Sequence, residues 1–272
     1  MAETSIRLEI VDAVAHITLD RPASRNSIDL PMARALLAAV SAVARDNTAR
    51  AVILRSSTAH FMVGGDVRRF GTLLDGPPSV CHAELDQLVA TANAATLCLT
   101  RLACPVVGLV QGSVAGFGFS LAMACDLVVA ADDTRFNLAY SAIGATPDGG
   151  ASWHLPRLVG LQRALSIALL NTPVDAREAL AMGLVSQVVS ASELADAGQL
   201  LARRLAAGPA QAQANIKAML RGTFDTDLES ALATEKSSFL AMAETSDFVE
   251  GVRAFLGRRP PRFGNRRADP GY

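Results

Sequence analysis

Hydrophobic positions recur along the chain in two different patterns, and the change between them divides the sequence. Short apolar runs of strand length come first, at Ile6–Val11 and Val14–Leu19, with a two-residue turn between them. Three further apolar runs, at 51–55, 105–110 and 126–130, are each long enough for one buried strand. The first half of the chain is therefore predicted to supply the strands of a sheet.

Helical patterns lie between these apolar runs. Pro31 stands where the first turn of a helix tolerates proline, so a helix is expected over 31–45, and further helical patterns follow over 79–101 and 116–125. Strands that are apolar on both sides and alternate with helices favour a mostly parallel sheet that is covered on its faces. The predicted fold class is α/β.

Beyond Pro147 the pattern becomes nearly all helical. One short apolar strand is expected at 184–189, among helices predicted over 149–158, 160–169, 175–181, 191–207, 209–221, 225–243 and 245–256. We expect the chain to divide into an α/β core over 1–190 and a helical region over 191–272. The alanine-rich amphipathic helices of the second region have apolar faces that need a partner, which indicates a subunit interface.

Composition excludes several classes of protein. The 272-residue chain is 50% hydrophobic and 19% charged, with a formal net charge of −1, which is unlike a disordered chain or a general nucleic-acid binder. The four cysteines show no CxxC spacing, and no pair among His16, His60, His82 and His154 has metal-ligand spacing. We therefore expect no metal site and no disulfide framework, with the histidines on the surface or in loops.

One segment could also be read as membrane-spanning. Residues 102–125 carry no charge, and Gly108, Gly112 and Gly116 have GxxxG spacing, a pattern found in transmembrane helices. Pro105 and the turn-forming residues after Val110 interrupt this run, so a buried strand, a loop and a buried helix explain it better. The first eleven residues lack the long apolar stretch of a signal peptide, and we expect a cytoplasmic protein without a membrane partner.

Two glycine-containing loops follow predicted strands. One is Val63-Gly64-Gly65-Asp66 and the other is Ala115-Gly116-Phe117-Gly118-Phe119. Glycine lets the backbone approach a ligand closely, and a helix that begins there offers free N–H groups at its partially positive end. Two such loops could direct two amides at one developing oxyanion, although glycine pairs also mark ordinary turns.

A series of motifs carries a resemblance to a known family. In chain order these are Leu19-Asp20-Arg21-Pro22 through Asn26-Ser27, Phe61 to Asp66, Pro105 to Gly108, Gln111 to Gly116, Ala122 to Leu127, Phe136, Gly144 to Gly150, Leu155-Pro156-Arg157 and Arg258 to Phe263. Over nearly its whole length the chain resembles the crotonase family, also called the enoyl-CoA hydratase/isomerase superfamily. The set is highly specific for the family and much less specific for the reaction.

The resemblance implies a fold and a class of substrate. The implied fold is a spiral of ββα units followed by a C-terminal helical trimerisation region, so that the protein would be a homotrimer or a hexamer built as a dimer of trimers. The implied substrate is an acyl-CoA thioester, with coenzyme A as part of the substrate and no separately bound cofactor. Its oxyanion hole would consist of the backbone amides of Gly65 and Phe117, and Phe117 replaces a family glycine.

The resemblance also assigns contacts with coenzyme A. Ser27 and Ile28 match the stretch along the pantetheine arm, and Asp66 lies in the loop near the adenine. The remaining implied contacts are in the two glycine loops and just after the last predicted helix: Val63, Gly64, Gly116, Arg258 and Arg259. Asp66 could instead be a helix cap. The two arginines would reach a neighbouring subunit's coenzyme A, and they could equally be a solvated basic helix end.

The residues at the family's acidic positions favour one reaction over another. Hydration of an enoyl thioester needs two carboxylates, but Ser120 and Tyr140 occupy the positions that match the hydratases' glutamates. Asp148 occupies the acidic position of the family's double-bond isomerases, including those that resemble ring-epoxide isomerases, and one carboxylate suffices for isomerisation. An apolar pocket would raise its basicity. The sequence thus favours an isomerase, although an Asp-Gly pair could also cap a helix.

Three other functions stay open at the level of the sequence. The first is a hydratase with a non-standard acid/base set. The second is a thioester hydrolase, because the residues around Ser120 approach a G-x-S-x-G motif and His154 could serve as its base; Ser120, however, is expected about three residues inside a helix, where a nucleophile elbow does not place its serine. The third is a catalytically silent protein that binds coenzyme A.

Overall fold

Six strands form the central sheet of the computed structural model, which describes residues 5–264. Their spatial order is β1 (Ile6–Val11), β2 (Val14–Leu19), β3 (Ala51–Ser56), β4 (Val106–Val110), β6 (Leu127–Ala131) and β9 (Gln187–Val189). Only β1 and β2 pair antiparallel; every other neighbouring pair is parallel. The predicted α/β class and its mostly parallel sheet are confirmed.

Side chains of the central strands alternate between two apolar layers. Ala15 and Ile17 of β2 lie in the larger core on one face, whereas Val14 of the same strand belongs to a second core on the other face. Because consecutive side chains of a strand point to opposite faces, burial on both faces produces the continuous apolar runs of the sequence.

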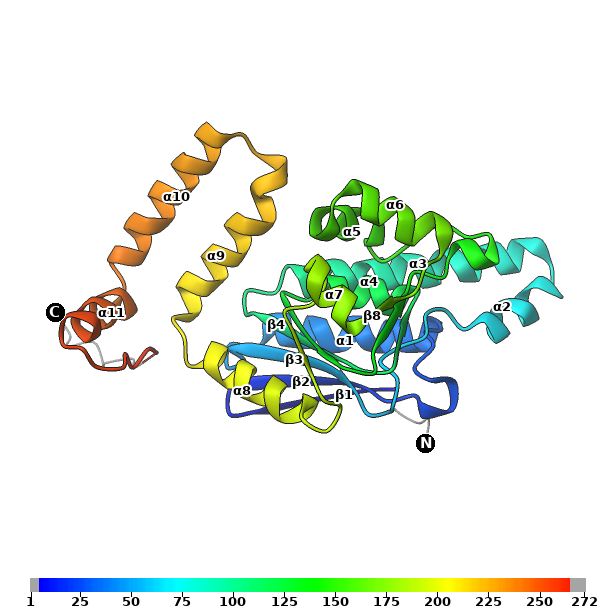
Figure 1. The fold of residues 1–272 in the computed structure, drawn as a ribbon, viewed down its shortest axis with the longest axis horizontal. Coiled ribbons are helices and arrows are strands. Elements are labelled where there is room, and N and C mark those ends of the chain that lie inside the picture. Colours follow the sequence, from blue (N-terminus) through cyan, green and yellow to red (C-terminus); the bar gives the residue numbers. More distant parts are fainter. Residues whose placement is uncertain (1–4, 265–272) are drawn as a thin grey trace.

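Helices cover both faces of this sheet (Figure 1). On one face α1 (Leu30–Arg45) packs against α3 (Pro78–Thr100) and, with α4 (Phe117–Ala124), encloses the larger core. Helix α8 (Leu194–Ala206) covers the other face through Leu194, Ala202 and Ala206. The smaller helices are α2 (Val67–Leu74), α5 (Ala151–Val159), α6 (Leu161–Leu170) and α7 (Ala176–Met182).

A second, three-stranded sheet stands at the edge of the larger core. It contains β5 (Ser113–Ala115), β7 (Arg135–Asn137) and β8 (Val174–Asp175) in that order. The sequence did not predict these strands, because two or three residues give no periodic signal; the eight-residue helix α2 was not predicted either. β5 begins at Ser113, where the sequence predicted a turn, and it positions the loop that contains Gly116.

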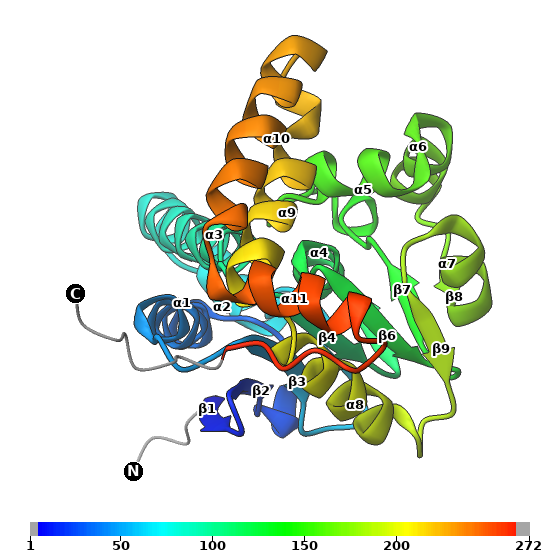
Figure 2. The ribbon, with the colours of Figure 1, turned by 90° about the vertical axis from the view of Figure 1, so that its left-hand side faces the viewer.

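Three C-terminal helices leave the body as an arm (Figure 1). They are α9 (Ala210–Gly222), α10 (Leu228–Ala243) and α11 (Ser246–Leu256), and Figure 2 shows α9 and α10 side by side as a hairpin. Large apolar side chains of the arm are open to solvent, among them Leu228 (74% exposed) and Phe255 (84% exposed). Helix α8, which the sequence grouped with this region, packs on the sheet instead.

The structure tests two further expectations, on the placement of the histidines and on the uncharged segment 102–125. His16 and His154 are buried, with 8% and 7% of their surface exposed, so the expectation that all histidines lie on the surface or in loops is wrong for these two. Residues 102–125 are divided among β4, β5 and α4. In the part of the chain that the structure describes, no helix combines the length and the apolar character needed to cross a bilayer.

Candidate active site

The two glycine loops meet backbone to backbone. Gly64 has φ = 91° and Gly116 has φ = 51°, a region that residues with a side chain rarely adopt. A β-carbon added to Gly64 would lie 3.3 Å from Cα of Gly116, and one added to Gly116 would lie 3.3 Å from Cα of Gly64. Both loops therefore need glycine, for their conformation and for their close approach.

Neighbouring backbone holds these loops in register. The amide of Ala115 donates to the carbonyl of Met62 (2.8 Å), and the amide of Ile28 donates to the carbonyl of Gly64 (2.7 Å). On the other side of the loop, the amide of Asp66 donates to the carbonyl of Ile28 (2.9 Å). The loop around Gly64 is thus tied on one side to the second sheet and on the other to the segment after β2.

Several amides in these loops donate no hydrogen bond to the described residues, and those of Gly65 and Phe117 are two of them. Phe117 is the first residue of α4, so its N–H lacks an intrahelical acceptor, as expected for a helix N-terminus. Within residues 5–264, neither this N–H nor that of Gly65 donates a hydrogen bond. Because Gly64 and Gly116 touch, the amides that follow them lie in neighbouring loops.

The residues implied in coenzyme A binding near the start of the chain are connected through Arg21. Its guanidinium donates to the carbonyl of Ser27 (2.6 Å) and pairs with the carboxylates of Asp66 (3.0 Å) and Asp29 (2.9 Å). The motifs include Arg21 but indicate no role for it. Asp66 is 45 residues further along the chain, and only the fold brings the two charges together.

Asp66 is also the N-cap of helix α2, because its carboxylate accepts from the amide of Arg69 (3.2 Å). Burial raises the pKa of this carboxyl, but the hydrogen bonds from Arg69 and Arg21 outweigh burial and hold the pKa below its usual range. The helix-cap role expected as the alternative for Asp66 is therefore present in the structure.

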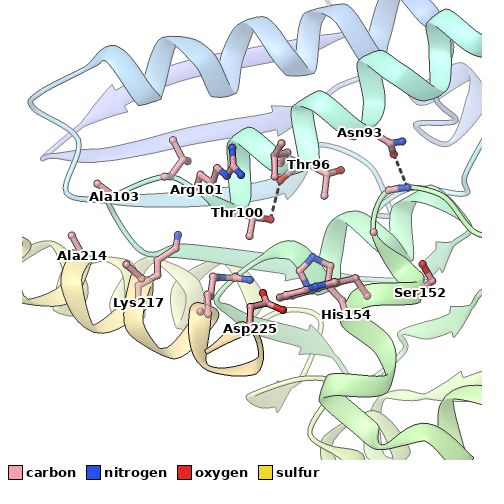
Figure 3. Close-up of a pocket in the computed structure, with 18 of the residues that line it drawn as sticks. Asn93, Thr96, Thr100, Arg101, Ala103, Ser152, His154, Ala214, Lys217 and Asp225 are labelled. Atoms are coloured by element: carbon pink, nitrogen blue, oxygen red, sulfur yellow. Dashed lines mark hydrogen bonds between the residues drawn. The ribbon is translucent and has the colours of Figure 1, made fainter. Parts of the chain in front are cut away.

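Asp148 lies in the segment between the 3₁₀ turn Ser141–Ile143 and helix α5. Its carboxylate Oδ1 accepts from the hydroxyl of Tyr140, and its backbone carbonyl accepts from the hydroxyl of Ser120 (2.9 Å). The next amide, that of Gly149, donates to Oδ1 of Asn93 on α3 (2.9 Å; Figure 3). Three separate elements thus hold this segment in one conformation.

Gly149 allows the segment around Asp148 to pack against helix α4, which begins with Phe117. It has φ = 60°, and a β-carbon there would lie 2.8 Å from the ring of Phe117 and 2.8 Å from Cβ of Ser120. The N-cap of α5 is Gly150, with no side-chain capping bond, so Asp148 does not cap this helix. The carboxylate is consequently free of a structural capping role.

Burial and one hydrogen bond act in opposite directions on Asp148. Burial raises the pKa of its carboxyl above the usual value, whereas the bond from Tyr140 favours the ionised form. Burial and the neighbouring Asp148 charge raise the pKa of Tyr140, so that its hydroxyl stays protonated and donates. Among the described residues none donates to the second carboxylate oxygen, Oδ2.

Ser120 and His154 do not form a nucleophile and base. The serine is buried in the fourth position of α4, and its hydroxyl bonds are to Asp148, to Tyr140 (3.3 Å) and to the carbonyl of Gly116 (3.5 Å). Burial, followed by the charges of Arg221 and Arg157, lowers the pKa of His154 to about 4. The two side chains therefore belong to different clusters.

A cavity of about 1040 Å³ opens beside Asp148 (Figure 3). Helix α3 forms one wall with Thr96, Thr100 and Arg101, and helix α9 faces it with Lys217. The start of α5, including His154, forms the side that adjoins Asp148. Asp148 and Gly149 line this cavity, whereas Gly65 and Phe117 do not; a β-carbon on Gly149 would contact the ring of Phe117.

Arg258 and Arg259 lie away from the other implied coenzyme A contacts of the same chain, just past α11 at the end of the arm (Figure 1). The guanidinium of Arg259 makes a bidentate pair with Glu250 (2.6 and 2.8 Å). Any contact of these arginines with coenzyme A would have to involve another subunit.

Comparison with known proteins gives one consistent result. The sequence profile described as enoyl-CoA hydratase/isomerase matches residues 9–266. A Rhodobacter capsulatus protein named a probable enoyl-CoA hydratase is 35% identical, covering 98% of this chain and all of that protein. The 1,2-epoxyphenylacetyl-CoA isomerase of Escherichia coli is 34% identical, covering 92% of this chain and 94% of its own length.

Solved structures agree with the sequence matches. The crystal structure of an enoyl-CoA hydratase from Polaromonas sp. JS666 superposes with a TM-score of 0.89 at 30% identity, covering 95% of this chain and 99% of that one. The names of these relatives include both hydratase and isomerase, so they agree on the family and differ on the reaction. With its fold, its glycine loops and its matched length, the chain belongs to the enoyl-CoA hydratase/isomerase family, the crotonase superfamily of acyl-CoA enzymes.

Proposed function

We propose that the protein is an enoyl-CoA isomerase that shifts a double bond with Asp148 as its single acid/base group. The observation that carries this proposal is the cluster of Ser120, Tyr140 and Asp148, in which two hydroxyls hold one carboxylate segment. Hydration requires one carboxylate to activate water and another to supply a proton. The cluster contains only one carboxylate, which suits a reaction in which a single group removes and returns a proton.

In the proposed reaction the acidic proton is the one on C2 of a 3-enoyl thioester. Oδ2 of Asp148 accepts this proton, and the C3–C4 double bond becomes a C2–C3 double bond as the same proton is returned to C4. Between these steps the negative charge rests on the thioester oxygen, which the free amides of Gly65 and Phe117 stabilise. The raised pKa of Asp148 suits a group that must accept and release a proton near neutral pH.

The cavity beside Asp148 is the proposed site of the acyl group. An acyl chain whose thioester oxygen bonds to the two amides would pass Asp148 and continue into the space between α3 and α9. The volume of about 1040 Å³ exceeds what a four-carbon acyl group fills and is in the range of pockets that hold drug-sized ligands.

Coenzyme A is proposed to lie along Ser27, Ile28 and the loop that contains Val63, Gly64 and Asp66, with Gly116 closing the other side. Arg21 is added to this set as the residue that orients Ser27 and Asp66. Its guanidinium is partly exposed and paired with two carboxylates, so its proposed role is to position these residues rather than to bind a phosphate.

The exposed apolar side chains of α9–α11 support the proposal of a homotrimer, or of a hexamer built from two trimers. Phe255 and Leu228 stay largely exposed among residues 5–264, and a monomer rarely exposes a large contiguous apolar patch. Sedimentation of the purified protein at micromolar concentration tests this proposal; a monomer would contradict it.

The reaction is tested with a panel of CoA thioesters: 3-enoyl, 2-enoyl and aryl. The expected result is conversion of the 3-enoyl thioester to its 2-enoyl isomer, abolished by Asp148→Asn. Ser120→Ala serves as the matched control, because it removes a hydroxyl of the same cluster without touching the carboxylate. Loss of activity in the serine variant alone would favour a hydrolase instead.

A further inference from the structure

The structure contains a cluster of charges away from Asp148 that the proposed reaction does not use. Asp126 comes just after Cys125, the C-cap of α4, and both of its carboxylate oxygens are engaged. Oδ2 accepts from the amide of Val106 (2.8 Å) and pairs with Nζ of Lys217 (2.7 Å). Oδ1 accepts from Nε (3.0 Å) and Nη2 (2.7 Å) of Arg221.

Both cations come from one face of helix α9. Lys217 and Arg221 are four residues apart, so their side chains emerge on the same side of the helix. Lys217 also donates to the carbonyl of Cys104 (3.2 Å), and Arg221 donates to the carbonyls of Ala124 (3.0 Å) and Cys125 (3.3 Å). Cations are favoured at the C-terminal end of α4, where carbonyls lack intrahelical partners.

Helix α9 has little else to hold it against the body. It contributes no fully buried residue, and its apolar residues Ile216 and Leu220 are 52% and 67% exposed. A second cavity, of about 420 Å³, separates α9 from the side of α5. The ionic cluster therefore crosses a partly open interface, and it fixes the distance between α9 and the body.

The position of α9 determines the shape of the larger cavity. Lys217, Ala214 and Ala218 of α9 form the wall that faces α3, and the same wall carries Arg221 (Figure 3). A shift of α9 would widen or narrow this space without moving Asp148 or the two amides, which are held by α3, α4 and the second sheet.

We propose that Asp126, Lys217 and Arg221 are positioning residues that fix α9 as the outer wall of the acyl cavity and thereby set its preference for extended acyl groups. The inference rests on the proposed function, because it takes this cavity as the acyl site. None of the three residues touches the reacting atoms; their effect on catalysis passes through the wall.

The test uses Lys217→Met and Arg221→Met in the full-length protein, since methionine keeps much of each side chain's length and removes its charge. Arg203→Met is the matched control, because the side chain of Arg203, on α8, makes among the described residues only a long surface pair with Asp12 (3.9 Å), which lies between β1 and β2. Substitution of Asp126 itself would also remove the acceptor of the Val106 amide and is the less informative variant.

The first readout is selectivity between a ten-carbon and a four-carbon 3-enoyl-CoA. Lys217→Met and Arg221→Met are expected to raise KM about tenfold for the ten-carbon substrate, the effect of losing contact with about two methylene groups, with kcat nearly unchanged. For the four-carbon substrate, KM and kcat of both variants should stay within about twofold of the wild-type values, because the short acyl chain is not expected to reach α9. An equal loss on both substrates would overturn the proposal.

The second readout does not depend on turnover. Trp153 is the only tryptophan of the sequence and lines the cavity, with the guanidinium of Arg157 4.1 Å from its ring centre. Saturated decanoyl-CoA, which cannot isomerise, should change the Trp153 fluorescence, whereas coenzyme A alone should not. The two α9 variants should bind decanoyl-CoA about tenfold more weakly, and Arg203→Met should bind it like the wild type.

The two readouts separate the possible failures. If decanoyl-CoA binding weakens in both α9 variants while no variant isomerises anything, the inference about α9 stands and the proposed reaction is wrong. If both variants are folded and retain wild-type affinity for decanoyl-CoA and wild-type selectivity, the ionic cluster does not position the wall and the inference is overturned.

Discussion

The two halves of the candidate site are built by different means. The amide half, at Gly65 and Phe117, consists of backbone that two glycines and the second sheet bring together. The carboxylate half, at Asp148, consists of side chains that Tyr140, Ser120 and Asn93 hold. The proposed role of the backbone half uses only N–H groups, so it does not depend on which side chain stands at 117, whereas the proposed role of the other half depends on the carboxylate of Asp148.

This difference explains why the family is easier to identify than the reaction. Backbone geometry is what the solved relative shares with this chain, since the Polaromonas enoyl-CoA hydratase superposes with a TM-score of 0.89 at 30% identity. The acid/base chemistry depends on which side chain occupies a few positions, and relatives named hydratase and isomerase match this chain about equally well. Experiments that damage one half at a time therefore reveal what each contributes.

The largest expected effect is that of Asp148→Asn on the carboxylate half. The amide keeps the shape of the side chain but cannot accept a proton, so turnover should fall by about 10²–10⁴-fold, the range of general acid–base catalysis. Affinity for a non-reactive acyl-CoA should change little, because the amide half and the coenzyme A contacts remain. Steady-state kinetics and a binding titration measure the two quantities; a loss of only a few-fold would assign the proton transfer to another residue.

Gly65→Pro breaks the amide half instead. Proline removes one of the two N–H groups, and turnover should fall by about 10²–10³-fold while the pH dependence set by Asp148 is retained. Gly65→Ala is the control, since it keeps the N–H and adds a β-carbon that would meet the movable ring of Phe70 at 2.7 Å. Equal losses in both variants would mean that bulk, and not the missing donor, causes the defect.

The depressed pKa of His154 predicts how stability changes with pH. Burial lowers its pKa from 6.5 to about 4 in the folded chain, so the unfolded chain binds a proton first as the pH falls below 6.5. The folded state should therefore lose about 2 kcal/mol between pH 7 and pH 5 through this group. Urea unfolding at both pH values measures the loss, and His154→Gln should reduce it; an unchanged loss would show that His154 is not the group responsible.

Tyr140→Phe should change the pH dependence of the reaction, with a smaller effect on turnover than Asp148→Asn or Gly65→Pro. Without the hydroxyl, the ionised form of Asp148 loses a hydrogen bond, its pKa rises further, and the acidic limb of the kcat/KM profile moves to higher pH. Turnover at neutral pH should fall about fivefold, the value of one hydrogen bond. Ser120→Ala should leave the acidic limb of the profile at the same pH, because the hydroxyl of Ser120 bonds to the backbone carbonyl of Asp148 and not to its carboxylate. If the acidic limb of Tyr140→Phe also stayed at the wild-type pH, the proposed role of Tyr140 would be wrong.

The smallest expected effect concerns the arm. Replacing Arg258 and Arg259 by alanine should weaken coenzyme A binding a few-fold in the oligomer, since exposed ion pairs contribute at most about 1 kcal/mol. Arg259 is already paired with Glu250 within its own chain, which limits what it can offer a neighbour. A binding titration of the double variant measures this contribution, and unchanged affinity would leave both arginines as surface charge.

The sequence predicted the parts of the fold that periodic patterns encode. The strands Ile6–Val11 and Val14–Leu19 and the long helices agree with the structure to within a few residues, because runs of this length reflect burial. β5, β7 and β8 have only two or three residues each, and their positions depend on contacts with segments distant in the sequence. No local pattern encodes such strands.

The sequence could predict those residues of the candidate site that a motif marks by residue type and position. The motifs identified Gly64, Gly116 and Asp148 as residues of interest. Tyr140 was dismissed because it is not a carboxylate, yet its hydroxyl reaches Asp148, and only the folded chain brings residues 140 and 148 to hydrogen-bonding distance. The burial of His154 was missed for the same reason, because it depends on the packing of α5 against the body.

One carboxylate is proposed to move a proton without adding water, and the mass and structure of the product distinguish this reaction from the others. The enzyme is incubated with a 3-enoyl-CoA and, separately, with the matching 2-enoyl-CoA, because water adds only to a double bond conjugated with the thioester carbonyl, and the products are analysed by mass spectrometry and by NMR. Isomerisation predicts that the 3-enoyl-CoA gives a product of unchanged mass with its double bond between C2 and C3, and that the 2-enoyl-CoA gains no water. A 3-enoyl-CoA left unchanged while the 2-enoyl-CoA gains one water would make the protein a hydratase, and release of free coenzyme A would make it a hydrolase; either result would contradict the proposed function.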